Sequence, residues 1–215
     1  MGKEFKKMEP FIEGSLRYIS LEEAEEDIRD GWLAQFRGTG FISRAIQSAT
    51  GGLHSHSAMF RRHPHTKNRI DILEMREFHG GRIEELRSYV HNQSAEIDIF
   101  RIDPERWPDF DGAAAVAHML TITTGPRSRN YSYWSIFRIL IRKMPVLWRA
   151  FTATTDDELS RGNYTGFCSH CVAEAHRVGG GVDPVPRLPD HWVDPNHLTR
   201  SLLYNYHGTV RADGV

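Results

Sequence analysis

The sequence predicts an α+β domain in which a mostly antiparallel sheet packs against helices, and three observations lead there. Four segments with strand-like alternation come close together along the chain, at 32–37, 54–60, 69–75 and 95–102. The middle two are joined by a polar connector, 61–68, of the kind that closes a hairpin. Helical patterns stand before and after this group, which is typical of an α+β domain.

The helical segments are recognised by their periodicity and by the residues that end them. Ser20 would cap a helix at 21–30, and Gly31 would end it. Further helices are expected at 41–49, 112–124, 133–144 and 167–178, each followed by glycine or proline. The stretch 82–91 mixes strand and helix signals and stays unassigned. The Pro-rich tail from Asp183 is expected to be coil with short turns.

The composition of the chain limits the classes of function that it can have. The chain has 215 residues, 40% hydrophobic, which suits one globular domain. Its 27 basic and 28 acidic residues give a net charge of −1, so we expect no nucleic-acid partner. The N-terminus lacks the apolar core of a signal peptide, so we expect a cytoplasmic protein as synthesised, with later release or delivery to a cell wall left open.

Cys168 is a candidate nucleophile because it stands at the predicted start of a helix. A thiolate there faces backbone N–H groups and the positive end of the helix dipole, which lower the pKa of a thiol. The same N–H groups would stabilise an oxyanion. A buried structural cysteine would occupy the same place, so this alternative stays open.

The second cysteine, Cys171, lies one turn later. With Ala175 and Val178 it forms an apolar stripe, so we expect it in the core. Two other interpretations stay open: a redox pair with Cys168, and a zinc site that would add two histidines of the strand at 54–60, His54 and His56.

A nucleophilic thiol needs a base and a group that orients the base. His54 and His56 alternate along the predicted strand, on one face, and either would serve as the base. Glu74 interrupts an apolar strand and shares a face with Ile70 and Ile72, so it should have a buried partner. If the two strands pair, Glu74 would lie beside His56.

These pieces, in this order, resemble a known family over roughly residues 30 to 195. It is the permuted branch of the NlpC-type papain-like cysteine peptidases, with the YiiX-like and YebB-like bacterial proteins, and lecithin–retinol acyltransferases are relatives. The motifs that carry the resemblance are Ser55-His56-Ser57-Ala58, Glu74 at a strand end, Tyr131 after Gly125-Pro126, and Phe167-Cys168-Ser169. Because the histidine precedes the cysteine, the resemblance implies a circularly permuted papain-like fold.

The resemblance also implies roles. Cys168 would attack a carbonyl, His56 would be the base, with His54 as the alternative, and Glu74 would orient the base. The Cys168 backbone N–H and the Tyr131 hydroxyl would hold the oxyanion. The motif serines, Ser55 and Ser169, would also face the substrate or oxyanion.

The implied activity is a cysteine hydrolase that cleaves an amide bond through a thioester, with cell-wall peptides as substrate and no metal or cofactor. Two alternatives stay open: a lipid-directed acyl hydrolase or acyltransferase, and a non-catalytic binding or structural protein. We expect residues 1–30 to be an N-terminal extension and 31–205 the catalytic domain, with a helical insertion near 132–160. Within it, the aromatic and basic stretch Tyr133–Lys143 would form a lid or touch a membrane surface, and an ordinary packed helix whose cations reach water stays open as an alternative.

Overall fold

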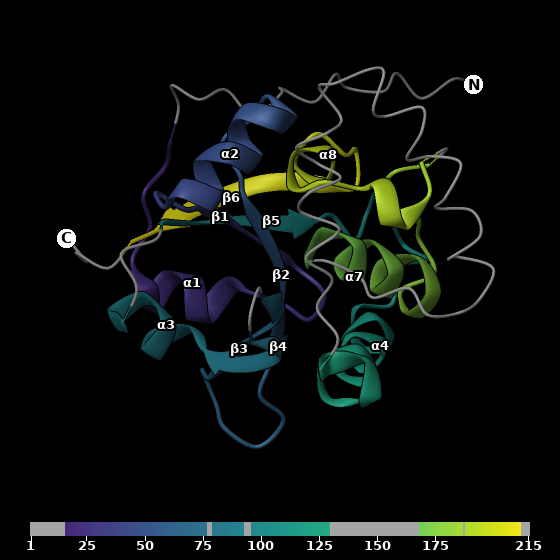
Figure 1. Cartoon of the computed structure of the whole chain (residues 1–215). Coiled ribbons are helices and arrows are strands. Elements are labelled where there is room, and N and C mark those ends of the chain that lie inside the picture. The colour runs from purple at the N-terminus through teal and green to yellow at the C-terminus, as the bar shows by residue number, and fades with distance from the viewer. Residues whose placement is uncertain (1–15, 77–78, 93–95, 130–167, 187, 212–215) are drawn as a thin grey trace, which may run out of the picture.

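The structure is a computed structural model, and it describes residues 16–76, 79–92, 96–129, 168–186 and 188–211. These residues form one antiparallel sheet of six strands with helices on both faces (Figure 1). The strand order across the sheet is β4-β3-β2-β1-β5-β6. The strands are β1 (Leu33–Arg37), β2 (His56–Arg62), β3 (Ile70–Arg76), β4 (Gly80–Glu85), β5 (Glu96–Ile102) and β6 (Tyr204–Val210).

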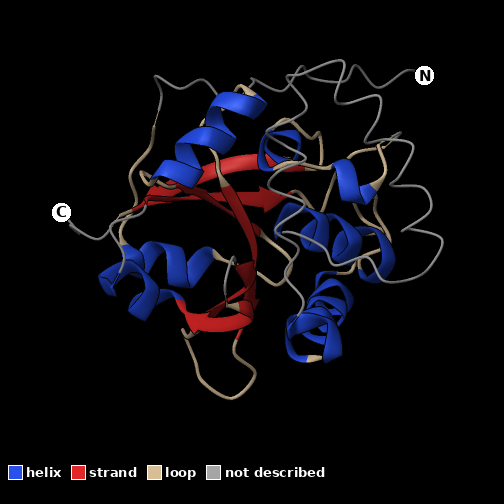
Figure 2. Ribbon diagram, viewed as in Figure 1, coloured by secondary structure: helices blue, strands red, loops and turns tan. Residues whose placement is uncertain are grey.

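The helices separate into two groups by the core that they share. α1 (Leu21–Asp27) and α3 (Leu86–Asn92) pack with one set of strand side chains. α4 (Gly112–Thr124), α7 (Cys168–Glu174) and α8 (Pro195–Thr199) pack with the alternate set. Neighbouring residues of β1 show this alternation: Leu33 packs in the core shared with α4, α7 and α8, and Ala34 packs in the core shared with α1 and α3. Figure 2 shows these helices lying to either side of the strands.

Several predicted elements are confirmed. β2 and β3 pair as an antiparallel hairpin, with Met59 opposite Leu73. α4 occupies the predicted range, and α1 begins at Ser20, whose side chain accepts a hydrogen bond from the Glu23 backbone N–H. α2 (Phe41–Thr50) ends at Gly51, whose φ of 67° is the left-handed conformation that glycine adopts readily.

Other elements differ from the sequence prediction. The tail is not only coil, because its last part forms β6, which pairs along the whole of β5 and becomes an edge of the sheet. The first four residues of β6, Tyr-Asn-Tyr-His, show no strong apolar alternation, so the sequence pattern did not reveal this strand. The unassigned stretch 82–91 is two elements, β4 and α3, which follow each other without a loop.

The cysteine helix also differs in its second half. After α7 the chain forms a π-helical turn, Ala175–Gly179. A π-turn inserts extra residues relative to an α-helix and so rotates later side chains off the original face. Ala175 stays buried, but Val178 is 52% exposed, so the predicted apolar stripe ends before it.

Residues 16–30, which we had assigned to an extension, pack as part of the fold. Ala24 and Ile28 of this segment are fully buried in the core beneath α1. Tyr18 forms a bridge with Thr209 of β6, so this segment lies along the edge strand. The predicted helix at 133–144 and the helical insertion near 132–160 lie outside the described residues. So does the stretch Tyr133–Lys143, which was expected to form a lid or touch a membrane.

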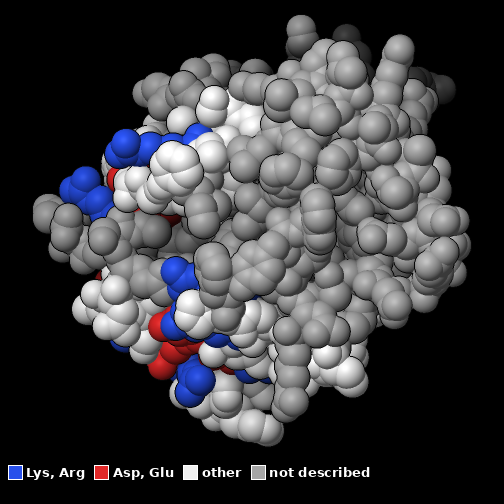
Figure 3. Space-filling model, viewed as in Figure 1, with Lys and Arg blue, Asp and Glu red and all other residues white. Residues whose placement is uncertain are grey.

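The described surface has mixed charge. In Figure 3, Lys and Arg side chains lie next to Asp and Glu side chains on the described part of the visible face. Within the described ranges, no helix combines the length and the apolar character that crossing a bilayer requires.

Candidate active site

An imidazole and a carboxylate meet at the end of the central hairpin. His56 is the first residue of β2 and Glu74 stands near the end of β3. Nε2 of His56 lies 2.7 Å from Oε2 of Glu74, and the glutamate side chain is fully buried. The expectation that Glu74 has a buried partner on the neighbouring strand is therefore confirmed.

Cys168 completes the group from a different part of the chain. It is the first residue of α7, which packs against β2 and β3, and it is 4% exposed. Its sulfur lies close enough to the His56 ring to shift the pKa of that ring. Nδ1 of His56 is nevertheless buried with no partner of good hydrogen-bond geometry. We conclude that the thiol lies near the ring but is poorly aligned, as thiol and base often are before substrate binds.

The charge state of His56 follows from these neighbours. Burial disfavours the charged ring and works to lower the pKa of His56. The negative charge and hydrogen bond of Cys168 oppose it, followed by the hydrogen bond and charge of Glu74. Together they raise the pKa of His56 well above its ordinary value of 6.5. The ring is therefore protonated at neutral pH when its two partners are negative.

Glu74 stays ionised in spite of its burial. Burial alone would raise the pKa of the Glu74 carboxyl, but the hydrogen bond and charge of His56, with the charges of Arg76 and Arg82, lower it overall. Its second oxygen, Oε1, is buried without a hydrogen-bond partner among the described residues, and Nη1 of Arg82 lies 4.0 Å from it. Sequence analysis did not single out Arg82; it reaches the site because β4 pairs with β3 and places Arg82 opposite Glu74.

His54, the alternative base, belongs to a separate network. It precedes β2, so strand alternation does not hold it on the face of His56. Nε2 of His54 lies 2.7 Å from Oδ2 of Asp98, and Nδ1 lies 2.9 Å from the Thr199 hydroxyl. Asp98 also accepts two hydrogen bonds from Arg37. With both ring nitrogens of His54 engaged, the structure gives no support to its role as base.

The segment that leads into His56 is fixed by the C-terminal part of the chain. The Asn196 side chain donates to the His54 carbonyl at 3.0 Å and to the Thr50 hydroxyl at 2.6 Å. A Cβ at Gly52 would lie 2.1 Å from the Asn196 amide oxygen, so glycine is required at this approach. Sequence analysis missed Asn196, because nothing local marks a residue whose partners are more than 140 positions away.

The two predicted substrate-facing serines both make backbone contacts. The Ser169 hydroxyl donates to the Val193 carbonyl at 2.6 Å and so ties α7 to the loop ahead of α8. The Ser55 hydroxyl oxygen accepts from the Gly38 N–H at 3.3 Å. Their roles toward substrate stay predictions. Tyr131 lies outside the described residues.

The second cysteine lies in the core, as predicted. Cys171 is 1% exposed and packs with the buried residues between α4, α7 and the sheet. Both cysteines are thiols rather than a disulfide. No group of three or more His, Cys, Asp or Glu side chains in the described part of the chain is arranged to hold a metal ion.

The sequence matches no protein-family model, and no curated protein is significantly similar to it. The argument for function therefore depends on the arrangement of Cys168, His56 and Glu74.

Proposed function

We propose that this protein is a cysteine hydrolase in which Cys168 is the nucleophile, His56 the base and Glu74 the residue that positions the base. The observation that carries the proposal is that one imidazole interacts with both a thiol and a buried carboxylate. Because Nε2 of His56 is held by Glu74, Nδ1 is the ring nitrogen left to exchange a proton with the thiol. A base oriented by a third group beside a nucleophile is the general requirement for this chemistry.

The proposed reaction is acyl transfer from an amide. The Cys168 sulfur attacks the carbonyl carbon, and the carbonyl oxygen becomes an oxyanion near the first backbone N–H groups of α7, which have no acceptor within the helix. Protonated His56 then gives its proton to the leaving nitrogen, the C–N bond breaks and a thioester remains. His56 next takes a proton from water, the resulting hydroxide attacks the thioester, and acid and free thiol are released.

The proposed fold family is the circularly permuted papain-like fold of the NlpC type. The order of the residues supports it, because the base and the acid come from the first half of the chain and the nucleophile from the second. The antiparallel sheet and a helix that begins with the cysteine are what such a fold needs. On this basis we propose cell-wall peptides as the substrate class.

The proposal is tested by turnover on two substrate sets, purified peptidoglycan peptides and acyl lipids, with products identified by mass spectrometry. We expect cleavage of an amide in the peptide set, loss of activity in Cys168→Ala and His56→Ala, and normal activity in the control Cys171→Ala. Cleavage of acyl lipids alone would support Cys168 and His56 as the catalytic residues but would make lipids, rather than peptides, the substrate class. If Cys168→Ala turned over either set as fast as the wild type, the proposal would be wrong.

A further inference from the structure

A pocket of about 480 Å³ opens at the end of the sheet where β1 begins. It lies between the C-terminal end of α1, the start of β1, β6 and the loop that follows β5. Its volume is in the range of pockets that hold small organic molecules. Neither Cys168 nor His56 lines it. His56 pairs with Phe36, near the far end of β1, whereas Trp32 of the pocket precedes Leu33 at the near end.

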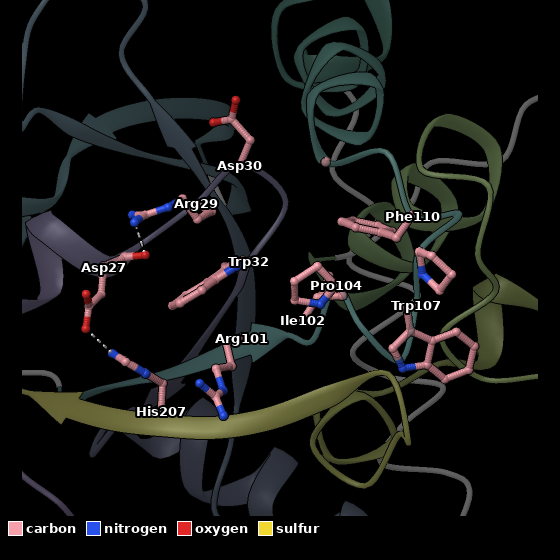
Figure 4. Close-up of a pocket in the computed structure, with 12 residues that line it drawn as sticks. Asp27, Arg29, Asp30, Trp32, Arg101, Ile102, Pro104, Trp107, Phe110 and His207 are labelled. Carbon is pink, nitrogen blue, oxygen red and sulfur yellow. Dashed lines mark hydrogen bonds and ion pairs between the residues drawn. The ribbon is translucent and has the colours of Figure 1, made fainter. Parts of the chain in front are cut away.

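The walls of the pocket are aromatic. In Figure 4 the Trp32 ring lies on one side, and Pro104, Phe110 and Trp107 lie on the other. Trp32 makes an edge contact with His207 of β6, with ring centroids 5.3 Å apart. Trp32, Trp107 and Phe110 are each only half-buried, so each keeps some exposed ring surface. Such walls favour a flat or apolar body.

The far wall is held rigidly by glycines. A Cβ at Gly31 would lie 2.8 Å from Cζ of Phe110, and a Cβ at Gly180 would lie 2.6 Å from Cε2 of the same ring. Gly31 also has a φ of 81°, a conformation that other residues rarely adopt. Phe110 is therefore packed between two backbone segments in the absence of any ligand. Because this wall is already ordered before a ligand arrives, the protein loses less conformational entropy when the ligand binds.

The acidic groups around the pocket already have partners. Oδ2 of Asp27 lies 3.2 Å from Nε2 of His207, and Oδ1 of Asp30 accepts from the Arg62 backbone N–H at 2.6 Å. The Arg29 guanidinium donates to carbonyls at the end of α1, including those of Glu26 and Asp27 at 2.6 Å. The two carboxylates and Nη1 of Arg29 are therefore already engaged within the fold.

Two further donors at the pocket make no hydrogen bond with the residues that the structure describes. Nε1 of Trp107 is buried and has no hydrogen-bond partner. Arg101 is exposed beside the pocket and makes no hydrogen bond or ion pair with the residues that the structure describes. An unpaired buried N–H costs free energy that an acceptor would recover. A cation with no partner favours an acceptor that is negatively charged.

We propose that this pocket binds a small organic anion with a flat, apolar body and a carboxylate or phosphate group. The body would lie against Trp32 and the wall opposite it, and the anionic group would accept hydrogen bonds from Arg101 or from the indole N–H of Trp107. The site is separate from Cys168, so it stands whether or not the chain is a hydrolase.

Calorimetric titration of the full chain tests the proposal with three probes of one shape: 2-naphthoate, 2-naphthyl phosphate and neutral 2-naphthylmethanol. We expect at least one anion to bind about tenfold more tightly than the alcohol, the ratio that one charge-assisted contact supplies. The anion that binds more tightly shows whether the pocket prefers a carboxylate or a phosphate group.

Three variants locate the site. Trp32→Ala should weaken all three probes, because it removes the wall. Arg101→Gln should weaken the anions about tenfold and leave the alcohol unchanged. Trp107→Phe keeps a ring but loses the indole N–H, so it should weaken the anions more than it weakens the alcohol. Arg44→Gln, at an exposed position on α2, is the matched control.

The proposal is overturned if neither anion binds at about millimolar concentration, or if the alcohol binds as tightly as both anions. It is equally overturned if anion binding is unchanged in both Arg101→Gln and Trp107→Phe, or if Arg44→Gln weakens it as much as they do. A Trp32→Ala protein that unfolds at the wild-type temperature and still binds all three probes normally would place the ligand elsewhere.

Discussion

Nε2 of His56, the first residue of β2, and Oε2 of Glu74, within β3, lie 2.7 Å apart. The pair depends on the hairpin register, which sets Met59 opposite Leu73 and so carries Glu74 toward the start of β2. A shift of the register by one residue would turn Glu74 to the opposite face of the sheet. The contact therefore fixes which ring nitrogen faces the thiol.

Glu74→Gln should lower kcat by less than removal of the base does. A glutamine still accepts a hydrogen bond from the ring, so it preserves the orientation of His56 but not the negative charge that stabilises an imidazolium. We expect a loss below the roughly 10²–10⁴-fold that a general base contributes. Steady-state kinetics of Glu74→Gln and His56→Ala on one substrate measure the difference, and equal losses would show that charge, rather than orientation, is the function of Glu74.

The titration of the His56 ring should report both of its partners. Because Cys168 raises the pKa of His56 more than Glu74 does, Cys168→Ala should lower the midpoint more than Glu74→Gln does. The measurement is the pH dependence of the His56 ring resonances in NMR spectra of the wild type and both variants. A midpoint that stays the same in Cys168→Ala would mean that the thiol and the imidazole do not interact.

Alkylation should distinguish the two cysteines. Cys168 is the first residue of α7 and its sulfur lies beside the His56 ring, the proposed base. Cys171 is 1% exposed in the core and has no such role in the proposed reaction. We expect iodoacetamide to modify Cys168 well before Cys171, as followed by peptide mass spectrometry. Equal rates, or faster modification of Cys171, would contradict the proposed nucleophile.

Much of the candidate site could be predicted because its signals are local. A carboxylate within the apolar run of β3 requires a partner, and the connector at 61–68 indicates which strand supplies it. The cysteine could be placed at a helix start from the sequence around it. For these residues, strand alternation and helix periodicity were sufficient.

What could not be predicted depends on contacts between distant residues. His54 has the same local pattern as His56, and only the approach of β5 and α8 assigns it to Asp98 and Thr199. β6 is a strand because β5 offers it an edge, not because its own residues alternate strongly. Arg82 and Asn196 were missed for the same reason.

His54→Ala and His56→Ala should have opposite effects. Removal of His54 leaves the buried Asp98 carboxylate with one hydrogen-bond partner fewer, so we expect a loss of roughly 1–3 kcal/mol in the free energy of unfolding. His56 lies at the end of a strand and is partly exposed, so its removal should cost less stability and abolish turnover. Urea unfolding and activity measured on both variants separate the two roles. A stable, inactive His54→Ala protein would reverse the assignment of the base.

A third histidine, His176, should make the fold sensitive to mild acid. It is fully buried in the π-turn after α7. Nε2 lies 2.7 Å from the Gly31 carbonyl oxygen, and Nδ1 lies 2.9 Å from the Val172 carbonyl oxygen and 3.0 Å from the Tyr204 hydroxyl. Burial raises the pKa of Tyr204 well above its ordinary value, so this hydroxyl keeps its proton.

Burial lowers the pKa of His176 to about 4, against 6.5 in an exposed histidine, and hydrogen bonds to the backbone at Gly31 and Val172 offset this only in part. Between these two pH values the unfolded chain binds a proton that the folded chain does not. The contribution of His176 is therefore complete above pH 6.5 and is lost as the pH falls toward 4, by roughly 3 kcal/mol in total.

His176→Gln isolates this effect, because glutamine has no titrating group and its amide can still donate to the Gly31 carbonyl. Urea unfolding of both proteins at pH 7.5, 6.5, 5.5 and 4.5 gives the difference in stability at each pH. Other groups that titrate, including the half-buried His207, contribute equally to both proteins and cancel. We expect the advantage of the wild type to shrink by roughly 2–3 kcal/mol between pH 6.5 and pH 4.5. A constant difference across this range would show that His176 is charged in the folded protein.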